Sequence, residues 1–102
     1  METSLDFTDV WQSLINLIKQ DTDVQDIPTK VSSVTLANRS NNSVKIKRSN
    51  YTSSPSIDKG FKLDAEGSGI WYVTLRNVDL SKTFIKSSIV SGTGAVDISV
   101  EI

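Results

Sequence analysis

The chain has 102 residues, a formal net charge of −1 and 23% charged residues, so it has the size of one domain and offers no strong field for nucleic acid. It contains neither Cys nor His, the thiolate and imidazole sources on which most hydrolytic and metal-dependent enzymes rely. We therefore expect a protein that is not an enzyme, with no catalytic residue, no cofactor and no metal site. The acidic N-terminus is unlike a signal peptide and no apolar run approaches the roughly 18–20 residues of a membrane span, so we expect no membrane partner.

The first predicted element is an amphipathic helix over residues 7–20. Its apolar residues recur at the three- and four-residue spacing that places them on one stripe: Phe7, Val10, Trp11, Leu14, Ile15, Leu17 and Ile18. Asp6 is the expected N-cap, and Lys19 lies in the last turn, where the helix dipole favours a cation. A helix this short is marginal in isolation, so its stripe must cover some surface.

Two roles for this stripe stay open. It could cover an open side of the domain to which it is attached, or it could dock on another subunit. Residues 21–30 are polar and acidic and indicate a linker, so we expect residues 1–30 to form a docking or oligomerisation arm and residues 31–102 a separate domain. The expected partner-binding residues are Phe7, Val10, Trp11, Leu14, Ile15 and Ile18, together with Tyr51 from a later loop.

Short alternating runs follow the linker and predict β-strands. Residues 34–36 and 44–47 flank a turn cluster and are expected to pair as a hairpin, and residues 49–59 lack any period and indicate a surface loop. Further strands are expected at 61–63, 70–76, 83–88 and 95–102. The last is the most regular, with Val96, Ile98, Val100 and Ile102 facing one way. This spacing indicates a β-sandwich or a small barrel, and we expect a mainly β fold: an antiparallel β-sandwich of six to seven short strands with one N-terminal helix.

The polar residues offer few alternatives. Lys45, Lys47 and Arg48 near Tyr51 could form a basic aromatic platform for single-stranded nucleic acid, but the net charge favours edge-strand protection by the lysines. Trp71 and Tyr72 are adjacent on a predicted strand and must point to opposite faces, so one is expected to be buried and the other exposed. An exposed aromatic ring could stack on a sugar or pack on a protein.

Several phrases in the second two-thirds of the chain carry a family resemblance. They are Val34-Thr-Leu-Ala-Asn38, Asn42-Ser-Val-Lys-Ile46, Gly60-Phe-Lys-Leu63, Asp79-Leu-Ser-Lys-Thr-Phe-Ile85 and Gly92-Thr-Gly-Ala-Val96. On these phrases the segment resembles small β-sandwich virion proteins of tailed bacteriophages. The turn usual in that group is replaced here by residues 64–69, and the N-terminal helix is not part of the shared pattern. The resemblance implies a body on the outside of a particle, with no catalytic residues.

The resemblance and the helix together predict a structural protein of the virion, made in the host cytoplasm. A capsid decoration or cement protein, or a head-fibre-base protein, is expected first. Its expected partners are the major capsid protein or another virion protein and copies of the chain itself, with a trimer favoured. The alternatives are a tail accessory protein, or a module that recognises carbohydrate or a host surface through residues 49–59 and exposed aromatics.

Overall fold

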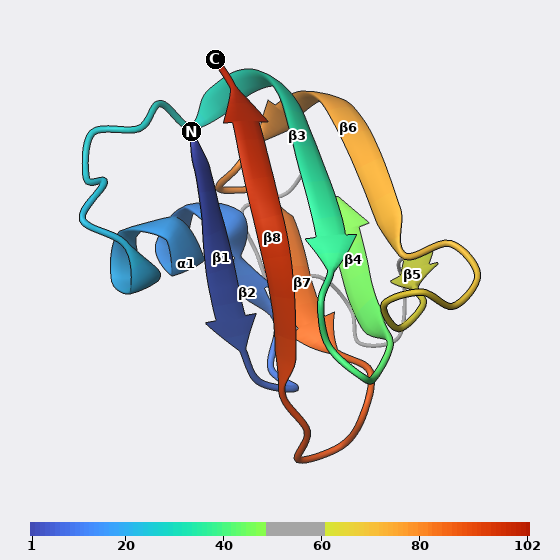
Figure 1. Ribbon diagram of the computed structural model, residues 1–102. Coiled ribbons are helices and arrows are strands. Elements are labelled where there is room, and N and C mark those ends of the chain that lie inside the picture. Colours follow the sequence, from blue (N-terminus) through green and yellow to red (C-terminus); the bar gives the residue numbers. More distant parts are fainter. Residues whose placement is uncertain (49–60) are drawn as a thin grey trace.

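The computed structural model describes residues 1–48 and 61–102, which form eight strands and one helix. The strands make two four-stranded sheets in which every pairing is antiparallel (Figure 1). The first sheet has the order β1-β8-β3-β6 and the second β2-β7-β4-β5. The elements are β1 Glu2–Phe7, β2 Gln12–Ser13, α1 Leu14–Asp21, β3 Lys30–Asn38, β4 Val44–Arg48, β5 Phe61–Leu63, β6 Tyr72–Asp79, β7 Thr83–Ser87 and β8 Gly94–Glu101.

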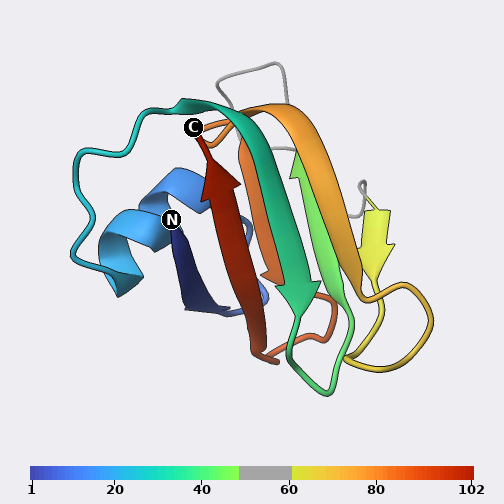
Figure 2. The ribbon, with the colours of Figure 1, turned by 45° about the horizontal axis from the view of Figure 1, so that its top comes forward.

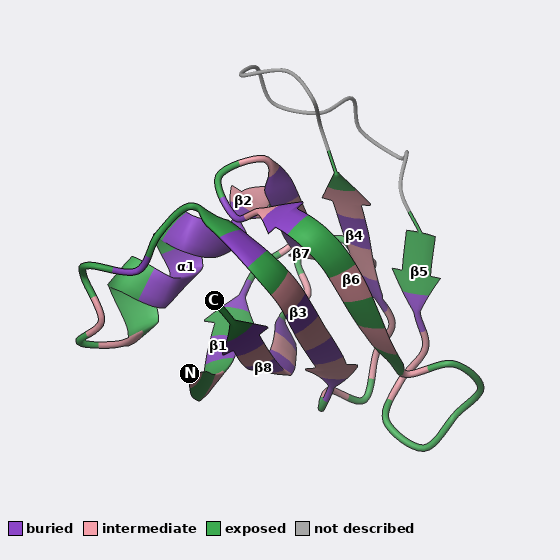
Figure 3. Cartoon of the chain, turned by 90° about the horizontal axis from the view of Figure 1, so that it is seen from above, coloured by how far each residue is buried: buried purple, intermediate pink, exposed green. Residues whose placement is uncertain are grey.

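Alternating side chains join the two sheets in one hydrophobic cluster. Leu5, Leu36 and Ile98 enter it from the first sheet, and Ile46 and Ile85 from the second. The two sheets form two layers (Figure 2), and buried and less buried positions alternate along their strands (Figure 3). Because each such side chain stabilises the fold by about 1.5–3 kcal/mol when buried, the alternation fixes which face of each strand points inward.

The C-terminal strand is predicted well from the sequence. Val96, Ile98 and Val100 are buried, and β8 pairs with β1 on one side and β3 on the other. The other expected strands are also found, as β3, β4, β5, β6 and β7. Ile102 lies beyond the strand and is exposed, contrary to the expected inward face.

The helix predicted over residues 7–20 is wrong in its first half. Residues 2–7 form β1, which pairs with β8, and α1 begins only at Leu14. The N-cap is Ser13, whose hydroxyl accepts a hydrogen bond from the Asn16 N–H, and not Asp6. Leu5 and Phe7 alternate with polar residues and face the core from a strand, so pairing with β8 overrides the helical spacing. The prediction of Lys19 in the last turn is confirmed.

Residues 1–30 do not form an arm apart from the sheets, which corrects the expected division at residue 30. β1 is an edge of the first sheet and β2 an edge of the second, and α1 lies beside both (Figure 1). Between α1 and β3 the chain has no regular element, yet Ile27 is buried in the core. The N-terminal third is therefore part of the same packed unit as the rest of the described chain.

The strands also differ from prediction in number and pairing. β3 and β4 do not make a hairpin, because β3 belongs to the first sheet and β4 to the second. Six to seven strands is too low a count, since β1 and β2 lie where a helix and its leading residues were expected. β4 has neighbours on both sides, so its lysines do not protect an edge. Lys45 instead lies between Lys62 and Lys86 in the register of the second sheet.

Candidate functional site

Exposed apolar side chains gather at one end of the two sheets. At this end β1 finishes opposite the start of β8, and β3 finishes opposite the start of β6. The loops that join β1 to β2, β3 to β4 and β7 to β8 meet there, at the bottom of Figure 1. The large apolar residues exposed at or beside this end are Val10, Ile70, Tyr72, Ile89 and Val90. This end is therefore the first place to look for a binding surface.

Three of these residues form what we call the loop patch, Val10 from the β1–β2 loop and Ile89 and Val90 from the β7–β8 loop. Val10 is 60% and Val90 85% exposed. The two loops are tied together, because the N–H of Ser91 donates to the Asp9 carboxylate at 2.7 Å and the N–H of Ser87 donates to the carbonyl of Thr8 at 2.8 Å. The patch is therefore a feature of two fixed loops.

The polar atoms next to the loop patch are incompletely paired. Within the ranges 1–48 and 61–102, the indole N–H of Trp11 and the hydroxyl of Ser88 are buried without a hydrogen-bond partner. The ammonium group of Lys86 lies 5.1 Å from the centre of the Trp11 ring, in the range of a cation–π contact. An unpaired buried polar group costs about 1–3 kcal/mol, and two such groups lie in this part of the fold.

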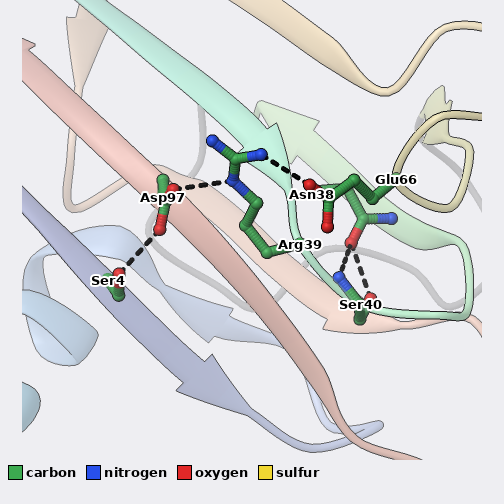
Figure 4. Close-up of polar contacts among 6 residues, drawn as sticks. All are labelled: Ser4, Asn38, Arg39, Ser40, Glu66 and Asp97. Carbon is green, nitrogen blue, oxygen red and sulfur yellow. Dashed lines mark hydrogen bonds and ion pairs between the residues drawn. The ribbon is translucent and has the colours of Figure 1, made fainter.

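A second constellation is centred on Arg39, just after β3. Its Nε donates to Asp97 at 2.7 Å and its Nη1 to Glu66 at 2.6 Å, while the Ser4 hydroxyl donates to Asp97 at 2.6 Å (Figure 4). The guanidinium carbon lies 5.4 Å from the centre of the Trp71 ring. The hydrogen bonds from Ser4 and Arg39 lower the pKa of Asp97, and those to Asp97 and Glu66 raise the pKa of Arg39. Both shifts favour the charged forms of Asp97 and Arg39.

Buried Asn38 holds the loop that carries this cluster. Its side-chain amide donates to the carbonyls of Asn42 and Asp64 at 2.9 and 2.8 Å, and its Oδ1 accepts from the N–H and hydroxyl of Ser40. Its backbone N–H donates to the carbonyl of Trp71 at 2.7 Å. A single buried side chain thereby joins the β3–β4 turn to the β5–β6 loop. Figure 4 shows its bonds to Ser40.

The outer face of the first sheet carries a row of four residues, one from each strand. Tyr72 lies opposite Ala37, Ala37 opposite Asp97, and Asp97 opposite Ser4. Beside this row is an open hollow of about 410 Å³. Apart from Ile98, its lining is small or polar, with Glu2, Ser4, Thr35, Ala37, Asp97 and Ser99 among the residues that form it. Tyr72 is 59% exposed and makes an edge-on contact with Trp71 at 5.2 Å between ring centres.

The structure separates the residues predicted to bind a partner. Four of them, Phe7, Leu14, Ile15 and Ile18, are buried within the chain, which corrects their assignment to a docking stripe. Trp11 is partly buried and Val10 is exposed. Tyr51 and the loop 49–59 lie outside the described residues.

Sequence reasoning missed the other residues of the loop patch and those on the outer face of the first sheet. Ile89 and Val90 form an apolar pair directly before the turn at residues 91–94, and an apolar pair in a turn region is a signal that could have been used. Arg39, Asp97 and Ala37 had no such signal, because strand pairing alone brings them together.

In the described part of the chain, no helix is long and apolar enough to cross a membrane, and no cluster of three acidic side chains could hold a metal ion. Comparison of the chain with protein-family models, with curated proteins and with solved structures gave no match.

Proposed function

We propose that the two sheets form a β-sandwich of the jelly-roll type. Strands pair as β1 with β8, β2 with β7, β3 with β6 and β4 with β5, and these pairs fall alternately in the first and second sheets. The chain thus follows the path of one long antiparallel hairpin that turns back between β4 and β5, and its paired strands wrap around the core. Double-sheet jelly rolls occur in viral capsid and lectin domains and in cupins, so this winding agrees with a virion role but does not by itself specify one.

The function we propose is structural: a virion protein of a tailed phage that decorates the capsid or forms the base of a head fibre. The observation that carries this proposal is the loop patch, where Val10, Ile89 and Val90 are exposed at one end of the two sheets, on loops joined by the bond from Ser91 to Asp9. The resemblance of residues 34–102 to small phage virion proteins supports the same function. The loop patch takes the docking role that the buried helix cannot have.

The chemistry of the patch favours a protein as its partner. In the loops 8–11 and 88–93 the only formal charge belongs to Asp9, whose carboxylate already accepts the bond from Ser91. The centres of protein interfaces are depleted of charge and enriched in apolar side chains. On a particle with many equivalent sites, even a small patch suffices where neighbouring copies raise one another's effective concentration.

A homo-oligomer, with a trimer favoured, remains part of this proposal. The helical stripe is no longer a candidate for its interface, since Leu14 and Ile18 are fully buried within one chain. Light scattering over a wide concentration range measures the solution mass directly. A monomer at every concentration would remove the oligomer from the proposal while leaving particle docking intact.

Co-sedimentation with purified particles of the phage that encodes the chain tests the docking role. We expect the wild-type chain to pellet with the particles in a saturable manner and Val90→Asp to pellet far less. Because Val90 is exposed, the free energy of unfolding should change by no more than about 0.5 kcal/mol.

Ile102→Asp is the matched control, since Ile102 is an equally apolar residue, 72% exposed, at the opposite end of the sheets. It should pellet like the wild type. Equal pelleting of Val90→Asp and wild type would disprove docking through the loop patch, and no pelleting of the wild type would disprove the capsid role.

A further inference from the structure

We propose that the outer face of the first sheet binds a neutral sugar, with Tyr72 as the stacking platform and Asp97 as the principal hydrogen-bond acceptor. This site is distinct from the loop patch and does not depend on the proposed virion role. The row Tyr72, Ala37, Asp97 and Ser4 crosses all four strands. Ala37, Asp97 and Ser4 line the 410 Å³ hollow, and Tyr72 lies next to Ala37, outside that lining.

The first step of the argument is shape. Tyr72 is exposed on the outer face and lies opposite Ala37, whose side chain is only a methyl group. A large ring therefore stands next to a low position on this face of the sheet. The hollow lies at the lower limit of the volumes that hold small ligands, which suits one or two sugar rings. The apolar C–H face of a pyranose can stack on an exposed aromatic ring, whose amphipathic character suits such a contact.

The second step is hydrogen bonding. Asp97 accepts one bond from Ser4 on Oδ1 and one from Arg39 on Oδ2, and a carboxylate has about four acceptor positions. Two positions therefore remain for sugar hydroxyl groups, on a side chain already held in place from both sides. Ser99 adds a hydroxyl group to the lining of the hollow, and the Thr35 hydroxyl, which is hydrogen-bonded to that of Thr74 at 2.9 Å, keeps at least one acceptor position.

The third step is charge. The charged residues that line the hollow, Glu2 and Asp97, are both acidic. Arg39 is engaged by Asp97 and Glu66, so its charge is balanced locally. A neutral sugar can donate hydroxyl protons to the two carboxylates, whereas a sialylated one would bring a third negative charge to them.

Titration of the full chain with lactose and cellobiose, followed by backbone amide chemical shifts, tests the site. An open site of this size should give a dissociation constant on the order of 1 mM. We expect shifts at Ala37, Tyr72, Asp97 and their strand neighbours with at least one of the two sugars, and much weaker shifts with 3′-sialyllactose. Absence of shifts with both neutral sugars, shifts located elsewhere, or equal binding of 3′-sialyllactose would overturn the proposal.

Variants separate stacking from simple proximity. Tyr72→Ala should weaken sugar binding by about five- to tenfold, and Tyr72→Phe, which keeps the ring, should bind nearly as well as the wild type. Asp97→Asn should weaken binding while Glu101→Gln, a carboxylate on the same strand face outside the lining, should not. Unchanged affinity in Tyr72→Ala would disprove the stacking role.

The two proposals fail separately. Val90→Asp should keep full sugar binding, and Tyr72→Ala should still sediment with particles. Sugar binding without particle binding would support this site and reject the capsid role. Particle binding without sugar binding would support the capsid role and reject this site.

Discussion

Asp9 and Ser91 are separated by 82 positions in the sequence, yet the Ser91 N–H donates a 2.7 Å hydrogen bond to the Asp9 carboxylate. This bond holds the β1–β2 loop against the β7–β8 loop and so keeps Val10 beside the segment that carries Val90. We expect Asp9→Ala to reduce particle binding several-fold, because the two halves of the loop patch lose their common support. The free energy of unfolding should fall by only about 0.5–1.5 kcal/mol.

Asp9→Asn is the control for that experiment, since its amide oxygen can still accept the bond from Ser91. It should keep most of the particle binding in the same sedimentation assay. If Asp9→Ala and Asp9→Asn bind equally well, the bond is not what organises the patch.

Leu14 distinguishes a structural helix from a docking helix. Its side chain is fully buried between α1 and the sheets, so Leu14→Ala should lower the free energy of unfolding by about 2–5 kcal/mol. Val10→Ala, an exposed neighbour, should change it by less than about 0.5 kcal/mol. Urea denaturation followed by circular dichroism measures both. An unchanged midpoint for Leu14→Ala would mean that the helix packs elsewhere.

Asn38 should be the most costly polar residue to remove. Asn38→Ala leaves the carbonyl of Asp64 without its side-chain donor, which should cost about 1–3 kcal/mol. The carbonyl of Asn42 loses one of two donors and keeps the hydroxyl of Ser40. Asn42→Ala is the matched control, because its backbone carbonyl, and not its side chain, accepts the bond from Asn38. Amide hydrogen exchange should quicken in residues 64–71 of Asn38→Ala. Exchange as slow as in the wild type would contradict an anchoring role.

Stability should fall in acid in a way that depends on two aspartates. Hydrogen bonds from Ser4 and Arg39 lower the pKa of Asp97 below its ordinary value of 3.8, and a hydrogen bond from the Ser81 hydroxyl lowers the pKa of Asp79. The folded state therefore holds these protons less tightly than the unfolded state. The resulting stabilisation is present above about pH 4 and is lost as the pH falls through the folded-state pKa values.

The urea midpoint of Asp97→Asn, compared with that of the wild type from neutral pH downward, isolates one of these groups. The difference between the two should be largest above about pH 4 and should shrink below it. Ser4→Ala, which keeps the bond from Arg39, should show a smaller difference at every pH. A wild-type advantage that grows as the pH falls would have the wrong sign for this explanation.

The strands were more predictable from the sequence than their partners. Val96, Ile98 and Val100 alternate with polar residues, and this local pattern alone predicts an inward face. The N-terminal segment mixes two periods: Leu5 and Phe7 follow the two-residue repeat of a strand, while Leu14 and Ile18 follow the repeat of a helix. Read together they mimic one long helix, and only the pairing of β1 with β8 separates them.

The candidate sites were less predictable still, for a physical reason. The sugar site depends on cross-strand register, because Tyr72, Ala37, Asp97 and Ser4 come from four distant places in the chain. The alternating pattern fixes which face of a strand points inward, but it does not say which distant strands pair, and these four residues meet only through that pairing. Local alternation predicted one of Trp71 and Tyr72 buried and the other exposed on opposite faces. Tyr72 is exposed, but Trp71 is only partly buried and its ring contacts that of Tyr72, because Trp71 lies before β6 begins.

The winding of the paired strands has a consequence for how the chain folds during synthesis. β8 lies in the interior of the first sheet, between β1 and β3, although it is made after the seven other strands. Until it emerges, β1 has no partner and one edge of β3 is open, and unpaired edges of this kind promote association with other chains. Closing the contact between Met1 and Val100 also joins residues 99 positions apart, which favours slow folding. Folding of the first sheet is thus a late event, gated by its last strand.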